Sequence, residues 1–201
     1  PAALLARLEK RLSLLTGGAR DLPERQQTLR ATIAWSYDLL DPGERSMFAR
    51  LAVFVGGCTI AAAIAVAESG EPLPIDPLDG LEGLVLKSLV RREDDLAAEP
   101  RFSMLETIRE FGLEQLAANP DEERNVRAAH AAFFREVVDL AIAAEDQVAS
   151  FADLETELGN LRSVLDWQER QGEGEAVLEF ATDLSWFWWV RGHLREGRDR
   201  L

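Results

Sequence analysis

The sequence predicts a mainly helical protein that carries one small two-stranded β-hairpin. Apolar residues recur at helical spacing through most of its 201 residues, as in the four leucines between positions 154 and 165. Cap-and-proline pairs such as Asp41-Pro42 mark helix starts, and glycine pairs such as Gly17-Gly18 mark helix ends. The β signal is the pair of short segments 88–91 and 101–104, which flank an acidic, proline-containing stretch.

Residues 1–40 are expected to hold two helices. The first covers residues 2–15, which are rich in the helix formers Ala, Leu and Arg, and it ends at the two glycines. The second follows Pro23 and has an apolar stripe that ends at Leu40.

Residues 41–118 are expected to form three helices, a hairpin and a fourth helix. Asp41 is placed to cap the first helix, with Glu44 completing a capping box. Thr59 and Asp76 are placed to cap the next two helices. The helices are expected at 42–54, 60–67 and 77–87, and after residue 104. This order of elements is that of a winged helix.

Residues 119–201 are expected to form the antiparallel helices of an α-solenoid. Asn119-Pro120 starts the first of them, and His130 lies on its apolar stripe as a packed residue. The spacing of a tetratricopeptide (TPR) signature is found at Leu184, Trp188, Gly192 and Gly197. The chain begins without Met and ends inside a helical pattern, so we expect it to be part of a longer protein.

Composition argues against several classes of protein and site. With 47% hydrophobic and 29% charged residues, the chain is typical of a globular protein. One cysteine, Cys58, and two histidines are too few for an internal disulfide or a zinc cage, and they favour a cytoplasmic location. The longest apolar run, 60–67, is far shorter than the ~20 residues of a membrane span. We therefore expect no metal and no membrane partner.

The net charge of −14 argues against a nucleic-acid partner. Residues 51–201 carry 14 Lys and Arg against 30 Asp and Glu. In DNA-binding winged helices the third helix enters the major groove. Here that helix has a net charge of −2 over residues 76–87, and the hairpin has −1 over residues 91–101. Because phosphate contacts require cations, the sequence predicts that this segment makes no direct contact with nucleic acid.

Several segments resemble one family. Residues 29–60, which contain the run Ser36-Tyr37-Asp38-Leu39-Leu40, look like the start of the second ARC subdomain in the signal-transduction ATPases with numerous domains (STAND). The segment is similar to bacterial LuxR-type and AfsR-like regulators and, more remotely, to plant NB-ARC proteins. Residues 5–30 resemble the end of the ATPase's helical subdomain, and residues 101–116 resemble the wing strand and final helix.

The resemblance implies a nucleotide-dependent switch. In the family, an upstream phosphate-binding loop holds ADP or ATP, and the winged helix folds over the nucleotide at rest. This chain has neither a Walker A loop nor a Walker B strand, so we expect no cofactor within it and ATP or ADP in an upstream core. Contacts with that core are expected at Trp35, Tyr37, Asp38, Met104, Leu105 and Glu106. The last three residues stand where the family often has Met-His-Asp, and Leu105 cannot make the histidine's hydrogen bond.

The run Trp186-Phe187-Trp188-Trp189 is the candidate partner surface. Four consecutive residues cannot all face one side of a helix, so at least one ring is expected to be exposed or to be covered by a neighbour outside the chain. One interpretation is a site for a protein or small-molecule effector. The alternative is packing between repeats, which bury their faces by stacking.

The sequence therefore predicts a non-catalytic segment that couples an ATPase core to a helical-repeat sensor and so to transcription. The alternative is a freestanding winged-helix DNA-binding protein with a helical dimerisation domain. An enzyme is not favoured, because no set of residues has the spacing of a catalytic site.

Overall fold

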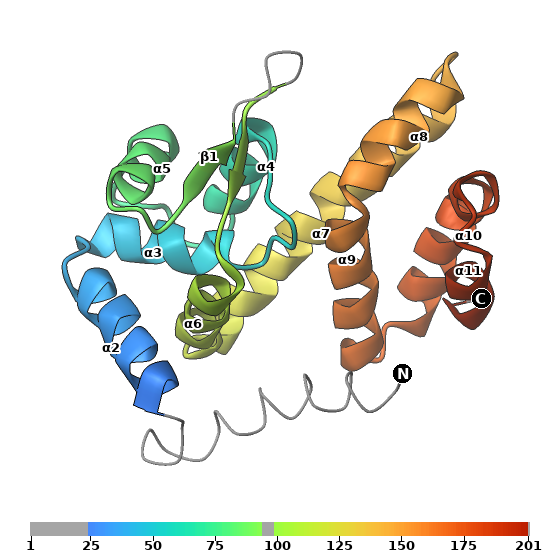
Figure 1. Ribbon diagram of the computed structural model, residues 1–201. Coiled ribbons are helices and arrows are strands. Elements are labelled where there is room, and N and C mark those ends of the chain that lie inside the picture. The colour runs from blue at the N-terminus through green and yellow to red at the C-terminus, as the bar shows by residue number, and fades with distance from the viewer. Residues whose placement is uncertain (1–23, 94–98, 201) are drawn as a thin grey trace. The chain divides into compact units, whose positions relative to one another are not determined.

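The computed structural model describes residues 24–93 and 99–200 and divides the chain into two units, Pro1–Leu40 and Asp41–Leu201. The described part of the first unit contains helix α2 (Glu24–Asp38). The helix expected at residues 2–15 lies outside the described residues. The second unit is a winged helix followed by an array of helices (Figure 1). The predicted fold class is confirmed.

Three short helices begin the winged helix: α3 (Pro42–Leu51), α4 (Ile60–Ala67) and α5 (Pro77–Leu86). Each starts at a side chain that accepts a hydrogen bond from the helix backbone, as the sequence predicts. Asp41 and Glu44 form a reciprocal capping box, and Thr59 and Asp76 cap α4 and α5. Helix α3 ends at Leu51, three residues before its expected end.

The hairpin consists of β1 (Arg91–Glu93) and β2 (Arg101–Ser103), which pair antiparallel. The position predicted for the first strand, 88–91, is wrong. The amides of Leu89 and Val90 both donate to the carbonyl oxygen of Leu84, at 3.0 and 3.3 Å, and both side chains are buried. These two residues therefore complete the end of α5, and the strand starts after them.

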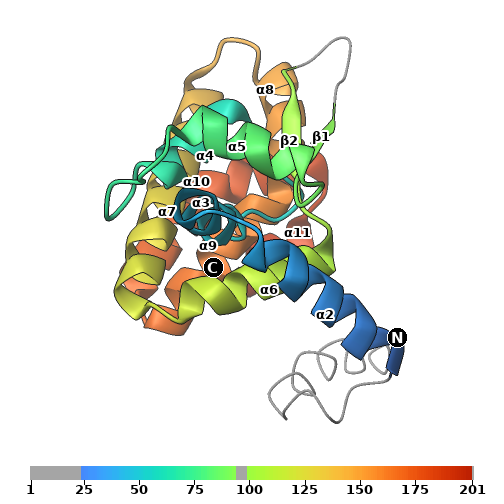
Figure 2. The same ribbon diagram turned by 90° about the vertical axis from the view of Figure 1, so that its left-hand side faces the viewer.

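The core of the winged helix forms around α3, which lies between α5 and α6 (Glu106–Ala117) in both views (Figures 1 and 2). Met47 of α3 is fully buried, as is Phe48, whose ring packs against Phe111 of α6 at 6.4 Å between centroids. Phe102 of β2 exchanges two backbone hydrogen bonds of 2.8 Å with Cys58, in the loop before α4. The hairpin is thereby joined to the core.

The array follows as α7 (Pro120–Ala143), α8 (Gln147–Thr156), α9 (Leu158–Gln171), α10 (Gly174–Arg191) and α11 (Leu194–Arg200). Helix α7 starts at Pro120 as predicted, and the Asn119 side chain caps it. The four leucines between 154 and 165 are all buried, but they belong to two helices because α8 ends at Thr156. Gly172 and Gly192 end α9 and α10 with φ of 76° and 84°, a conformation that glycine adopts without strain.

The long helix α7 joins the winged helix to the array. It packs against α4 and α6 of the winged helix and against α8, α9 and α10. Residues 41–201 are consequently one compact unit. The domain boundaries placed after residues 40 and 118 stay predictions.

Candidate functional site

Helix α5 presents one face to solvent. Its other face packs against α3 and α4 through Leu81 and Leu84, which are buried. The exposed residues are Leu78, Asp79, Glu82 and Leu86. Leu86 is 78% exposed. The outer face of α5 is therefore apolar and acidic, with no cation on the helix itself.

Strand β1 supplies the cations beside α5. Arg91 and Arg92 are both exposed. Arg101 on β2 is half-buried and forms an ion pair with Glu157 at the α8–α9 junction. Lys87, directly after α5, forms an ion pair with Glu44 of α3. In the described part of the hairpin, the exposed cations by surface area are Arg91 and Arg92.

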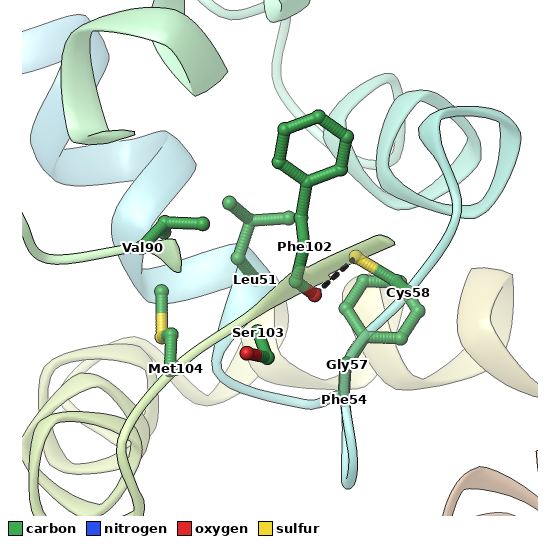
Figure 3. A pocket seen from close by; sticks show the side chains of 8 residues that line it. All are labelled: Leu51, Phe54, Gly57, Cys58, Val90, Phe102, Ser103 and Met104. Carbon is green, nitrogen blue, oxygen red and sulfur yellow. Dashed lines mark hydrogen bonds between the residues drawn. The ribbon is translucent and has the colours of Figure 1, made fainter. Parts of the chain in front are cut away.

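A small apolar recess lies under the hairpin (Figure 3). It is lined by Leu51, Phe54, Gly57, Cys58, Val90, Phe102, Ser103 and Met104. The space available to the centre of a water molecule is ≈ 10 Å³, about what one water requires. Burial raises the pKa of the Cys58 thiol to about 12, and its sulfur lies 3.6 Å from the carbonyl oxygen of Phe102. The recess is too small for a nucleotide, and its thiol is neutral at physiological pH.

The junction between wing and helix is formed by Met104, Leu105 and Glu106. Met104 lines the recess, and Leu105, the residue before α6, is 44% exposed and makes no side-chain capping bond. Glu106 pairs with Arg109 at 2.7 Å, and this hydrogen bond holds the pKa of the Glu106 carboxyl below its usual value. A role of these residues toward a nucleotide stays a prediction.

Trp35, Tyr37 and Asp38 lie in the last turns of α2. Trp35 is 65% exposed, Tyr37 is half-buried and Asp38 is exposed. They belong to the first unit, whereas the junction residues belong to the second. Their expected contact with an ATPase core stays a prediction.

The aromatic run of α10 divides into a buried pair and an exposed pair. Phe187 and Trp188 are buried, and Phe187 packs edge-on against Phe151 of α8 at 5.6 Å between centroids. Trp186 and Trp189 are 49% and 62% exposed, with stacked rings 4.8 Å apart. The prediction of exposure thus holds for two rings, and the partner they bind stays a prediction.

A polar joint between the winged helix and the array was not predicted from the sequence. The side-chain oxygen of Asn160, on α9, accepts the backbone N–H of Val55 at 2.7 Å. Its amide nitrogen donates to the carbonyl oxygen of Gly57 at 2.9 Å and to Glu157 at 2.7 Å. Asn160 is fully buried. A buried asparagine inside a leucine-rich stripe was the one local signal of this joint.

The described residues form neither a metal site nor a membrane span. Across 24–93 and 99–200, no group of three or more His, Cys, Asp or Glu side chains is arranged to hold a metal ion. In the same residues, no helix is both long and apolar enough to span a bilayer.

Comparisons with known proteins agree with the winged-helix geometry. Residues 40–117 match a family model described as "Winged helix-turn-helix domain". Over 199 residues the chain is 40% identical to the "Putative HTH-type transcriptional regulator Rv0890c" of Mycobacterium tuberculosis and to the "Putative HTH-type transcriptional regulator Mb0914c" of Mycobacterium bovis. The alignment covers 98% of this chain and 22% of each relative. The chain therefore spans about a fifth of the length of these relatives.

A weaker match links the chain to the "Uncharacterized protein Rv0894" of Mycobacterium tuberculosis. The identity is 33% over 124 residues, which are 61% of this chain and 31% of that protein. No solved structure matches the chain.

The matches contradict the prediction that this segment makes no direct contact with nucleic acid. That prediction rested on a count of charges, which reports only how many phosphate contacts a surface can make. It gave no weight to geometry, and the structure places Arg91 and Arg92 on the exposed wing strand that follows α5. Fold and match together identify residues 40–117 as a winged helix-turn-helix domain.

Proposed function

We propose that this chain is the winged-helix and helical-array segment of a transcriptional regulator, and that the winged helix contacts DNA directly. The observation that carries the proposal is the exposed outer face of α5 together with the exposed arginines of β1. In helix-turn-helix proteins the corresponding helix enters the major groove, while neighbouring cations bind the phosphates. The names of the mycobacterial relatives support the same function.

The exposed side chains of α5 can contact base edges in the major groove. Carboxylates such as Asp79 and Glu82 accept hydrogen bonds from the amino group of cytosine, and apolar side chains contact the methyl group of thymine. Arg91 and Arg92 are the candidate phosphate contacts. Each phosphate contact lowers log K by about 0.9 per unit of log salt concentration, so two contacts give a slope of about −2. The proposal therefore predicts weak binding with a shallow salt dependence.

The test is a binding assay on the 201-residue chain. Duplexes are first selected from a random pool at about 50 mM salt, and the affinity of the best is then measured by fluorescence anisotropy at several salt concentrations. Replacing both Arg91 and Arg92 with alanine is expected to weaken binding about tenfold or more and to flatten the salt slope. Replacing Glu82 with alanine is expected to change the preferred sequence while leaving the slope unchanged.

The matched control is Arg124→Ala combined with Arg198→Ala. These two arginines have side chains 68% and 76% exposed, lie on α7 and α11, and their loss changes the net charge by the same amount. The control is expected to bind as the unaltered chain does. Failure to select any duplex, or an equal loss in both double variants, would overturn the proposal.

We infer as a second function the nucleotide-switched coupling that the family resemblance implies. The polar joint favours this function, because it couples the winged helix to the array. Arg101 of the wing pairs with Glu157 at the α8–α9 junction, and the N–H of Val55 donates to Asn160 on α9. An upstream core that holds ATP or ADP is the proposed partner, in a cytoplasmic protein whose present segment performs no catalysis. Leu105→Arg in the full-length protein tests it through nucleotide exchange and transcriptional output, and no change in either would exclude the junction's role.

A further inference from the structure

We infer that the exposed face of α10 binds a cationic amphipathic peptide segment of a partner protein. The tryptophan face, as we call it, consists of Trp186, Trp189 and Val190. Their side chains are 49%, 62% and 42% exposed. Large apolar side chains exposed together on one face of a helix are typical of a protein interaction site.

The tryptophan face is already ordered in the free chain. The two indole rings stack 4.8 Å apart with 13° between their planes. The indole N–H of Trp186 donates to the side-chain oxygen of Gln147, on α8, at 3.2 Å, and the Gln147 amide donates to the carbonyl oxygen of Ile142 at 3.0 Å. Because these contacts hold the rings before a ligand arrives, binding loses little side-chain entropy.

Acidic residues lie on the same side of α10 as Trp186 and in the segment directly before α8. Helical spacing puts three carboxylates of α10 on the side of Trp186, and two more directly precede Gln147 on the chain. The five acidic residues are Glu145, Asp146, Glu175, Glu179 and Asp183. Arg135 of α7 offsets one of these charges, at 3.5 Å from Asp183 and 3.9 Å from Glu179. The surroundings therefore remain strongly negative.

Charge decides between the possible occupants of the face. A second copy of the chain carries the same net charge of −14, and nucleic acid is also anionic, so both are repelled. A cationic amphipathic helix complements both the exposed indole rings and the nearby carboxylates. Its apolar residues cover the rings, while its lysines or arginines pair with the carboxylates. Its cations also gain from lying over indole faces.

The test measures the affinity of a fluorescein-labelled helical peptide, made only of lysine and leucine, for the 201-residue chain. Replacing Trp186 and Trp189 with alanine is expected to weaken binding about tenfold or more, as for central aromatic anchors. Charge reversal by Glu179→Lys and Asp183→Lys is expected to weaken it at low salt. The same peptide with glutamate in place of lysine is expected not to bind.

The control removes exposed apolar area elsewhere, by Trp35→Ala combined with Leu86→Ala, whose side chains are 65% and 78% exposed. It is expected to leave peptide binding unchanged, and thermal melting verifies that each variant folds. Equal loss in the control, or equal binding of the glutamate peptide, would overturn the inference. Dimerisation that the tryptophan variant abolishes would also overturn the inference, because it identifies a second copy of the chain as the occupant. Protection of both indole rings from oxidation in a longer version of the chain would do the same, because it identifies another segment of that chain as the occupant.

Discussion

Replacing Arg50 with methionine is expected to destabilise the unit formed by residues 41–201 by about 3–5 kcal/mol. Arg50, on α3, has a side chain that is 3% exposed, and its guanidinium contacts three segments. One nitrogen donates to Glu122 of α7 at 2.6 Å, and the others donate to the carbonyl oxygens of Ala67, at the end of α4, and of Glu71, in the loop that follows. Methionine keeps the aliphatic packing but makes none of these bonds.

The size of this destabilisation follows from the polar groups that lose their partner when Arg50 is replaced. The Glu122 carboxylate, only 17% exposed, loses the charge that compensates it, and two carbonyl oxygens lose their donors. Removal of one partner from a buried ion pair costs about 3–5 kcal/mol, which for a unit of this size lowers Tm by about 10 °C. Urea and thermal unfolding followed by circular dichroism measure both quantities.

Arg124→Met is the matched control on α7. Arg124 and its partner Asp121 have side chains 68% and 85% exposed, so its loss is expected to change stability by less than about 0.5 kcal/mol. Adding Glu122→Leu to Arg50→Met removes the uncompensated charge and is expected to recover part of the stability. A loss below about 1 kcal/mol for Arg50→Met, or one equal to the control's, would refute the reasoning.

Three further predictions concern single positions. Ser88 has a φ of 59°, and glycine there is expected to raise the free energy of unfolding by about 0.5–1 kcal/mol in urea titrations, because the left-handed conformation strains a residue with a Cβ. Gly159→Ala would place a Cβ 2.6 Å from the carbonyl oxygen of Val55, so a loss of about 1–3 kcal/mol is expected, whereas Gly174→Ala, with open space around it, is expected to lose nothing. The Cys58 pKa, raised to about 12 by burial, predicts a folded thiol that reacts at pH 8 at least about a hundredfold more slowly with a disulfide reagent than the unfolded chain. The unfolded thiol ionises from about pH 9 while the folded one keeps its proton, so this group lowers stability as the pH rises from 9 toward 12.

Local signals predicted the starts of α3, α4, α5 and α7 correctly. Asp41, Thr59 and Asp76 cap the helices expected of them, and Asn119 caps α7 at its predicted start, because a cap and its backbone partner lie within three residues of one another. Tertiary contacts decided the remaining features. The leucine stripe reads as one helix, but α8 ends just before Glu157, whose side chain bonds to Asn160 and to Arg101, 56 residues earlier.

In the candidate sites too, some features follow from the local sequence and others from tertiary contacts. The sequence indicated that the aromatic run of α10 cannot be wholly buried, since successive residues point 100° apart. Only the packing of α8 against α10 determines that Phe187 is buried and Trp189 is exposed. The joint at Asn160 links residues 105 positions apart, a separation at which a single sequence carries no pairing information. The count of charges likewise predicted that the net charge of α5 is negative, but it could not predict which side chains of the wing are exposed.

The charge distribution determines the affinity and the orientation of the proposed DNA contact. Two exposed arginines on the wing provide little phosphate affinity, so base contacts from α5 have to supply a larger share than in a basic winged helix. The acidic helices of the array repel DNA that comes within about 10 Å of them at 0.1 M salt, which favours the approach in which the wing faces the duplex. A contact of this kind is selective but weak. It becomes tight when two such contacts are linked in one assembly, because the second then binds at the high effective concentration that the link imposes.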